Sequence, residues 1–354
     1  MDDDLHHDPD GPVLIVGGYG TVGTELTRLA ARSWPLLLAG RTPGRGRALA
    51  NEVGAAVRRW DLDAPEPFSA KPRAVVGTVN DPDDRVLRAA LRGGVPYVDI
   101  TRWTARLQRA LALTAVTPPT APVLLSSGWM GGIGSLVAAA LADRVGGAAA
   151  AVEIAVRYDL RDRAGADSVE FMDRLGLDYE VTEGGRRRLV TPLSGAGRVT
   201  IGGHRTMVAR IDTPEQFTLP LALGADTAVT RIGFSTNTST AALLALKQTG
   251  FFRWGRGDRF RSLRRSLLHS PGEGGTALMR VDVRGRNGQR RTAVVRDPAG
   301  QAHLTAVGAL LGLRRVLGED GAAASAGASF PESVPEPRLV LWALEEAGVT
   351  VTVS

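Results

Sequence analysis

One stretch near the start of the chain decides the fold: Val13-Leu14-Ile15-Val16-Gly17-Gly18-Tyr19-Gly20-Thr21-Val22-Gly23. Its first four residues are apolar and mostly β-branched, which predicts a buried strand. The glycines that follow match the pattern G-x-G-x-x-G, and apolar residues behind them recur at helical spacing. A strand that enters a helix through such a turn begins a dinucleotide-binding βα unit.

Each glycine of this pattern has a separate task. Gly18 permits the tight turn, Gly20 lets the backbone approach a pyrophosphate, and Gly23 lets the helix pack on its strand. The amide groups of the first helical turn then face the anion. We predict that this loop binds the cofactor through Gly18, Tyr19, Gly20, Thr21, Val22 and Gly23. The alternative is a purely structural glycine-rich turn, in a chain that contains 43 glycines.

The next predicted strand, residues 35–39, ends at Gly40-Arg41-Thr42. A site that prefers NAD places Asp or Glu here to bind the ribose 2′-hydroxyl, and an acidic group would repel a 2′-phosphate. Arg41 instead offers a guanidinium, which binds phosphate in bidentate fashion. The sequence therefore favours NADP(H), with Arg41 and Thr42 at the site. The alternative is that Arg41 is a solvated surface residue.

Polar residues also follow the later strands of this region. The predicted strand 57–60 ends at Asp61, where a side chain can flank the adenine. The strand 74–77 leads into Thr78-Val79-Asn80, and a further strand contains Tyr97 and ends at Asp99. Ligands of open α/β sheets bind beyond the carboxyl ends of the strands. We therefore expect residues 78–80 and 99–103 to lie near the nicotinamide.

The predicted architecture is α/β, with a doubly wound parallel sheet followed by a second α+β domain. Residues 1–10 hold five aspartates and predict a disordered acidic tail, and residues 11–135 alternate short strands with helices. Residues 136–310 form the second domain, for substrate binding or dimerisation, and residues 311–354 are expected to pack back towards the first. Strands of a mixed or antiparallel sheet are predicted in this second domain at 152–158, 199–201, 206–211, 229–234 and 277–283.

Composition excludes several classes of protein. The 354 residues include no cysteine, so disulfides, thiolate metal sites and thiol nucleophiles are ruled out. The three histidines beyond the tail, His204, His269 and His303, have no metal-ligand spacing. Residues 110–142 carry no charge, but prolines and glycines interrupt them, which argues against a membrane span. No signal peptide is apparent. We expect a soluble, cytoplasmic protein without a bound metal.

The motifs together resemble a known family, the saccharopine dehydrogenase-like oxidoreductases, and its reductase branch in particular. The resemblance rests on the glycine loop, on Gly40-Arg41-Thr42, and on the segments VVGTVN (75–80) and GVPYVDIT (94–101). The segment SGWMGGI (127–133) resembles the family's crossover into its second domain, which usually carries proline where this chain has Gly131. The resemblance implies an N-terminal Rossmann domain, a second domain with a mixed sheet, and a homodimer.

The catalytic candidates are Asp99 and, more weakly, Tyr97. Hydride transfer needs chiefly the cofactor, and an iminium substrate already carries its proton, so no strong acid is required. Asp99 stands where the family has its Tyr-Val-Asp element, and can stabilise a cationic imine or relay a proton. The alternatives are that Asp99 caps the following turn through Thr101, and that Tyr97 is a core aromatic residue.

Substrate-binding candidates lie on the two loops expected to face the nicotinamide. Arg102 can hold a carboxylate, and Trp103 and Trp129 can form the wall of a dry pocket. For each of them, simple packing or solvation is the competing interpretation.

Residues 251–300 contain twelve arginines, with aromatic residues among those at 251–260. Basic residues interleaved with aromatics are typical of nucleic-acid binding. The spacing of Phe260, Leu263 and Leu267, however, predicts an amphipathic surface helix with a solvated basic face. We therefore favour a solvated face over a contact with an acidic carrier protein, and regard nucleic acid as the least favoured partner.

Three functional hypotheses follow from the sequence. The first is an NADPH-dependent reductase of a C=N or C=O group in a small amino-acid-derived or secondary-metabolite substrate. The second is a trans-acting enoyl reductase that acts on an acyl chain bound to an acidic carrier protein. The third is a non-catalytic protein that senses NADP(H) or serves as a scaffold.

Overall fold

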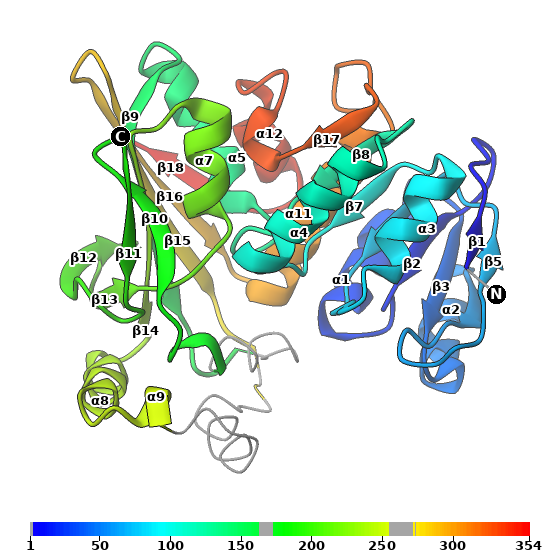
Figure 1. The fold of residues 1–354 in the computed structure, drawn as a ribbon, viewed down its shortest axis with the longest axis horizontal. Helices are drawn as coiled ribbons and strands as arrows, with labels where there is room; N and C mark the ends of the chain where they lie inside the picture. The colour runs from blue at the N-terminus through cyan, green and yellow to red at the C-terminus, as the bar shows by residue number, and fades with distance from the viewer. Residues whose placement is uncertain (1–2, 163–172, 255–271, 273) are drawn as a thin grey trace. The chain divides into compact units, whose positions relative to one another are not determined.

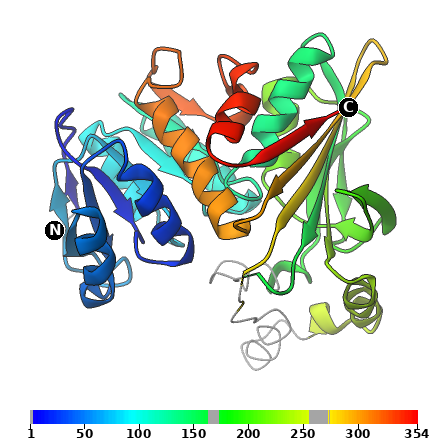
Figure 2. The same cartoon turned by 180° about the vertical axis from the view of Figure 1, so that it is seen from behind.

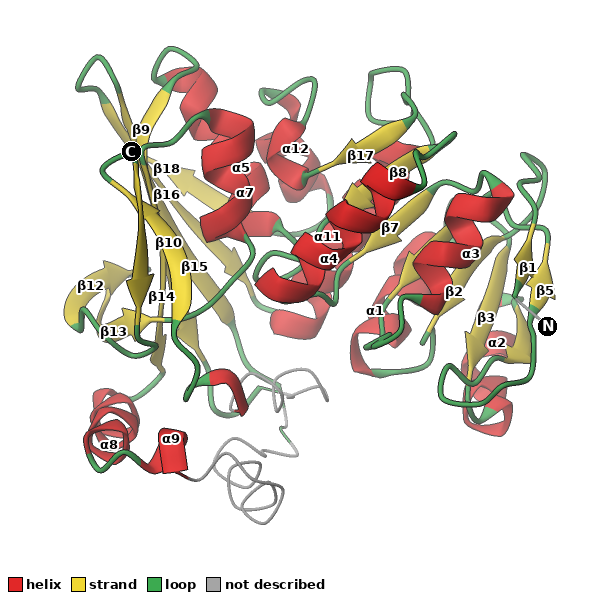
Figure 3. Cartoon of the chain, in the orientation of Figure 1, coloured by secondary structure: helices red, strands yellow, loops and turns green. Residues whose placement is uncertain are grey.

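The computed structural model describes residues 3–162, 173–254, 272 and 274–354. The chain forms two compact units, which are described separately. The first comprises residues 1–132 and 305–331, and the second comprises residues 133–304 and 332–354. The predicted fold class is confirmed: the first unit holds a parallel sheet with helices on both faces, and the second holds a mixed sheet (Figure 3).

The first unit is built on a seven-stranded parallel sheet in the order β17-β8-β7-β6-β2-β3-β4. The chain enters at β2, adds strands on one side, and then crosses to the other side of β2. The strands are β2 (Val13–Val16), β3 (Leu36–Gly40), β4 (Ala56–Arg59), β6 (Ala74–Gly77), β7 (Tyr97–Asp99), β8 (Pro122–Leu125) and β17 (Gly327–Ser329). The reversal of strand order beside β2 is the place where doubly wound sheets bind their ligands.

Helices cover both faces of this sheet. In the view of Figure 1, α3 (Arg85–Gly93) and α4 (Thr104–Val116) lie in front of the strands. The opposite face carries α1 (Thr21–Ala30), α2 (Arg47–Val53) and α11 (Gln301–Val316) (Figure 2). Of α11, residues 305–316 belong to this unit. Central strands such as β2 are apolar throughout because both of their faces are buried.

The second unit contains a seven-stranded mixed sheet in the order β12-β13-β14-β9-β15-β16-β18. Only β14 and β9 run parallel, and the other pairs are antiparallel. The strands are β9 (Ala149–Tyr158), β12 (Gly197–Ile201), β13 (His204–Arg210), β14 (Thr227–Phe234), β15 (Ala277–Gly285), β16 (Arg290–Asp297) and β18 (Thr350–Val353). All five strands predicted for this region are therefore present.

Further elements complete this unit. The helices α5 (Ile133–Arg144), α7 (Glu215–Leu223) and α12 (Leu339–Glu346) pack near the sheet. The sequence did not predict a separate hairpin formed by β10 (Tyr179–Glu183) and β11 (Arg186–Val190). The described residues of this unit also form the helices α8 (Asn237–Gln248) and α9 (Phe251–Trp254). The helix expected around residues 260–267 falls outside the described part of the chain.

The N-terminal segment corrects one prediction. Residues 3–10 do not form a disordered tail, because β1 (Asp4–Leu5) pairs in parallel with β5 (Ser69–Ala70). The carboxylate of Asp3 forms an ion pair with Arg85 at 2.8 Å and accepts a hydrogen bond from the backbone of Phe68. Asp3, which looked like solvated charge in the sequence, is thus held by a distant arginine.

The domain boundaries also differ from the prediction. The second unit begins at residue 133 rather than 136. The C-terminal segment expected at 311–354 is divided, because residues 332–354 belong to the second unit, where β18 pairs with β16. No helix in the described part of the chain is long and apolar enough to span a membrane.

Candidate functional site

The glycine loop between β2 and α1 has the geometry that its sequence predicts. Gly17 has a positive φ of 87°. A Cβ atom on Gly23 would lie 2.0 Å from the carbonyl oxygen of Gly17, so the helix can approach the strand only because residue 23 has no side chain. The hydroxyl of Thr27 donates to the carbonyl of Gly18 at 2.8 Å and fixes the turn from the helix side.

The N-terminus of α1 is suited to an anion. The first helical hydrogen bond is donated by the amide of Thr24 to the carbonyl of Gly20. The amides of Thr21, Val22 and Gly23 precede it, and no side chain caps the helix at Gly20. The first turn also contains no acidic residue. Unsatisfied amides and the positive end of the helix dipole together favour a phosphate at this position.

The loop after β6 lies directly beside the glycine loop. A Cβ on Gly17 would meet the side chain of Val79 at 2.3 Å and that of Thr78 at 2.7 Å. The amide and hydroxyl of Thr78 both donate to the carbonyl of Val16, at 3.0 and 2.9 Å. Strand pairing of β2 with β6 therefore brings together two of the predicted cofactor-binding segments, residues 18–23 and 78–80.

Tyr19 occupies the end of β3. Its hydroxyl accepts a hydrogen bond from the amide of Thr42 at 3.1 Å. A Cβ on Gly40 would lie 2.4 Å from the Tyr19 hydroxyl oxygen, and a Cβ on Gly46 would lie 2.6 Å from its ring. Burial raises the pKa of the Tyr19 hydroxyl, which therefore stays neutral. The position where an NAD site presents a carboxylate is thus filled by a neutral phenol.

The predicted partner of a 2′-phosphate, Arg41, is exposed at this strand end. Its guanidinium lies 3.6 Å from the carboxylate of Asp63, and both side chains reach solvent. Exposed pairs of this kind contribute about 0–1 kcal/mol, so Arg41 can exchange this partner for a phosphate. Asp61, predicted near the adenine, caps a turn by accepting from the amide of Asp63 and pairs with Arg59.

Asp99 is the centre of a buried hydrogen-bond network at the end of β7. One carboxylate oxygen accepts from the hydroxyl of Tyr97 at 2.6 Å and from Nε of Arg102 at 2.8 Å. The other accepts from the amide and hydroxyl of Thr101 and from the hydroxyl of Ser127. The bond from the Thr101 amide is the capping contact that the sequence offered as the alternative to catalysis.

The electrostatics of Asp99 limit what it can do. Burial by itself would raise the pKa of this carboxyl, but the charge of Arg102 and the hydroxyls of Tyr97 and Ser127 outweigh that effect and lower it. Burial also raises the pKa of Tyr97 well above its usual value. Asp99 is therefore a fixed carboxylate and Tyr97 a fixed phenol, so this pair positions its surroundings and is poorly suited to relay a proton.

Arg102 is held inside the protein by two carboxylates. Its side chain is fully buried and forms ion pairs with Asp84 and Asp99. Asp84 also pairs with Arg109 at 2.6 Å and adopts a positive φ of 56°, which is uncommon for a residue other than glycine. This placement argues against the carboxylate-binding role predicted for Arg102. The arginine instead joins the loop before α3 to the end of β7.

The two tryptophans proposed as pocket walls stand in different surroundings. Trp103 precedes α4, and the guanidinium of Arg106 stacks over its ring at 4.9 Å. Trp129 is half-buried in the turn after β8, where three successive residues have positive φ: Met130, Gly131 and Gly132. The structure therefore places Trp103 in packing contacts.

Sequence reasoning missed several charged groups. Asp81 caps α3 through the amides of Arg85 and Val86, and no motif indicated this. In the second unit, Nδ1 of His303 lies 2.7 Å from the buried carboxylate of Asp297, an arrangement that fixes the orientation of the imidazole. The only sequence signal for this pair was an aspartate at a strand end followed closely by a helix.

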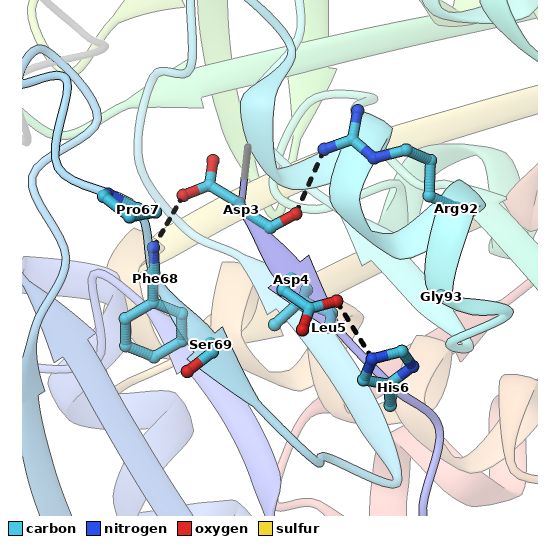
Figure 4. A pocket seen from close by; sticks show the side chains of 9 residues that line it. All are labelled: Asp3, Asp4, Leu5, His6, Pro67, Phe68, Ser69, Arg92 and Gly93. Carbon is cyan, nitrogen blue, oxygen red and sulfur yellow. Dashed lines mark hydrogen bonds and ion pairs between the residues drawn. The ribbon is translucent and has the colours of Figure 1, made fainter. Parts of the chain in front are cut away.

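One cavity of about 550 Å³ lies beside β1 and β5 and includes none of the predicted site residues (Figure 4). Its charged side chains already have partners: Asp4 pairs with His6 at 3.0 Å, the carboxylate of Asp3 pairs with Arg85, and Arg92 donates to the backbone carbonyl of Asp3. We therefore assign these groups to the anchoring of the N-terminal segment. Within the described ranges, no three His, Asp or Glu side chains cluster in a way that can hold a metal ion.

Comparison with known proteins identifies the architecture. No family model matches the chain, and no curated protein sequence matches it. Among solved structures, the saccharopine dehydrogenase (L-Glu forming) of Saccharomyces cerevisiae is similar over 97% of this chain and 99% of that chain, with a TM-score of 0.66 and 14% identity. The chain has the saccharopine dehydrogenase-like fold.

Two further solved structures were found at lower similarity. One is scyllo-inositol dehydrogenase from Lactobacillus casei with NAD(H) and scyllo-inositol, with a TM-score of 0.44 and 11% identity over 96% of this chain and 98% of that chain. The other is amine dehydrogenase from Mycobacterium smegmatis, with a TM-score of 0.40 and 13% identity over 92% of this chain and 96% of that chain. Neither score is high enough to support an argument about this chain.

The local geometry of the crossover turn accounts for one departure from the sequence pattern that the chain otherwise resembles. The chain has Gly131 where the family usually carries proline. Gly131 adopts a φ of 64°, which a proline ring cannot adopt, and a Cβ there would lie 2.6 Å from the carbonyl of Thr305. The crossover turn of this chain therefore requires glycine.

Proposed function

We propose that the protein is an NADPH-dependent oxidoreductase that reduces a C=N or C=O group in a small amino-acid-derived or secondary-metabolite substrate. The observation that supports a dinucleotide site most strongly is the glycine loop with its uncapped helix. The amides of residues 21–23 are available to a pyrophosphate, and residue 20 leaves the space above the loop open. The loop after β6 then borders the same site through Thr78 and Val79.

The preference for NADP(H) rests on the end of β3. A carboxylate at residue 40 would displace the Tyr19 ring, so the group that normally binds a free ribose hydroxyl has no room. Arg41 and Arg45 are exposed beside Tyr19 and act on its hydroxyl electrostatically. Two guanidinium groups and the hydroxyl of Thr42 form a suitable donor set for a 2′-phosphate.

A bound nicotinamide would supply the hydride. The chain's own part is to hold the loops around the ring, and the Asp99 network does this by linking the loop before α3 to the ends of β7 and β8 through Arg102 and Ser127. An iminium substrate needs no proton from the protein, which agrees with the fixed protonation states of Asp99 and Tyr97. Both residues then remain catalytic candidates only in an electrostatic or positioning sense.

The proposal is tested by turnover. The purified chain is incubated with NADPH and a panel of cyclic imines, amine–aldehyde mixtures and α-keto acids, and loss of the reduced-nicotinamide absorbance is recorded. We expect turnover with at least one imine or ketone and none in the absence of substrate. Turnover only with carrier-bound enoyl chains would instead support the enoyl reductase hypothesis.

A further inference from the structure

The strand β18 forms one edge of the sheet in the second unit. One doubly bonded pair of residues shows which positions of β18 are hydrogen-bonded to β16. The amide of Thr292 donates to the carbonyl of Ser354, and the amide of Ser354 donates back, each at 2.9 Å. In an antiparallel ladder such doubly bonded pairs alternate with unbonded pairs. Thr352 and Thr350, opposite Val294 and Arg296, are therefore bonded to β16, while Val351 and Val353 are not.

The backbone groups of Val351 and Val353 must consequently point away from β16. Within the described residues, β16 is the only strand that pairs with β18, and no other backbone group bonds to either valine. Figure 2 shows β18 along the border of the sheet. Two amides and two carbonyls thus form an unpaired strand edge.

This edge lacks the features that prevent pairing with another strand. Protected edges carry charged residues, proline or a bulge. The sequence Thr-Val-Thr-Val contains none of these, and its pairing with β16 shows no shift of register. By contrast, the strand at the other edge, β12, contains Arg198 and Gly197.

We propose that β18 pairs antiparallel with β18 of a second copy of this chain, around a two-fold axis at Thr352. The outward groups fix this register. Val351 of one copy and Val353 of the other exchange two backbone hydrogen bonds. The two-fold axis generates the same two bonds between Val353 of the first copy and Val351 of the second, so both outward amides and both outward carbonyls of each strand are paired. Thr352 then faces its own counterpart in an unbonded pair.

Charge favours a second copy as the partner. Antiparallel pairing places Thr350 opposite Ser354 of the other copy, and Ser354 in turn pairs with Thr292, next to Arg291. The acidic end of α12, at Glu345, is therefore brought towards the basic end of β16, at Arg290 and Arg291, in the other copy. These three side chains are exposed, and none has an ion pair with another described residue.

The absence of native cysteine provides a direct test. In an unbonded antiparallel pair the Cα atoms lie about 4.5 Å apart, which is within the range of a disulfide. Thr352→Cys should therefore form a disulfide-linked dimer under mild oxidation, seen on a non-reducing gel. Thr350→Cys is the matched control, since Thr350 is exposed on the same face but would lie about 14 Å from its counterpart, beyond disulfide reach.

A second variant tests the interface without a cross-link. Val351→Pro removes an outward amide and no bond to β16, so the sheet should remain intact. We expect sedimentation velocity to give twice the chain mass of 37.3 kDa for the wild type and the mass of one chain for this variant. The variant should bind NADPH as tightly as the wild type. A monomeric wild type, equal cross-linking at residues 350 and 352, or a dimer that survives Val351→Pro would each overturn the proposal. Because NADPH binding is measured separately, these outcomes do not depend on the proposed function.

Discussion

Nε of Arg102 lies 2.8 Å from a carboxylate oxygen of Asp99, and both side chains are shielded from solvent. The same guanidinium also bonds to Asp84, so one arginine neutralises two buried carboxylates from different loops. Such a pair is costly to desolvate when it forms, but it is much more costly to break by removing one partner. Arg102 therefore determines whether the loops at the carboxyl ends of β6 and β7 keep their positions.

We predict that Arg102→Met lowers the free energy of unfolding by about 3–5 kcal/mol, because Asp99 would be left as a buried charge without its cation, and Asp84 would keep only the partly exposed Arg109. Urea denaturation followed by circular dichroism measures this change. The control is Arg88→Met on α3, an exposed arginine whose replacement should change stability by less than about 0.5 kcal/mol. Equal effects of the two substitutions would contradict the structural role of Arg102.

Replacement of Asp99 by Asn should separate positioning from proton transfer. The lowered pKa keeps Asp99 ionised at neutral pH, so the pH profile of kcat/KM in the wild type should show no group that belongs to it. We expect Asp99→Asn to reduce stability strongly and to raise KM for the cofactor, because the loops lose their anchor. Loss of an ionisation from the pH profile, with stability unchanged, would instead identify Asp99 as the acid or base.

Two glycines of the cofactor loop should respond differently to a methyl group. Gly23→Ala forces a contact of 2.0 Å with a backbone carbonyl, so it should reduce both the melting temperature and cofactor binding. A Cβ at Gly20 meets one tight contact, 3.2 Å from the carbonyl oxygen of Gly17, which a small backbone shift relieves, and its φ of −79° suits alanine. Gly20→Ala should therefore fold normally yet bind NADPH at least about tenfold more weakly, because the methyl group occupies the path of the pyrophosphate. Thermal melts and fluorescence titrations distinguish the two; normal binding by Gly20→Ala would place the cofactor elsewhere.

The local part of the fold was predictable from sequence because neighbouring residues determine it. The strand 13–16, the loop 17–23 and the helix behind them form one contiguous unit, and Gly40-Arg41-Thr42 follows its strand directly. The predicted strands of the second domain were found for the same reason, since alternation along a strand reports a half-buried face.

The partners of the buried charges could not be predicted in the same way. Arg102 looked like an exposed ligand for a carboxylate, but its partner Asp84 lies 18 positions earlier, on a different loop. Asp3 looked disordered, although it binds Arg85, which is 82 positions away. Only the arrangement of the strands brings such groups together, so a residue's type and local pattern cannot reveal whether it serves a ligand or the core.

A buried carboxyl in the second unit should make stability depend on pH. Burial raises the pKa of Glu332 to about 7; the hydroxyls of Thr218 and Ser135 offset part of this effect, and the charge of Glu215 adds to it. The folded state then holds a proton that the unfolded state has already lost, so stability is greatest below about pH 4.5 and falls as the pH rises towards 7.

Glu332→Gln should remove this dependence and increase the free energy of unfolding at pH 8 by about 2–3 kcal/mol. Denaturant unfolding at a series of pH values measures it, and Glu336→Gln, at an exposed position nearby, is the control. A slope that Glu332→Gln leaves unchanged would show that another group is responsible.

The central claim, an NADP(H) site between the glycine loop and the end of β3, is tested most directly by titrating the protein with NADPH and with NADH. Nicotinamide fluorescence reports both, for the wild type and for Arg41→Ala, with Arg32→Ala at the far end of α1 as the control. We predict that the wild type binds NADPH at least about tenfold more tightly than NADH, that Arg41→Ala weakens NADPH alone, and that Arg32→Ala changes neither. Equal or tighter binding of NADH by the wild type would contradict the role of Arg41, and binding of neither would contradict the site itself.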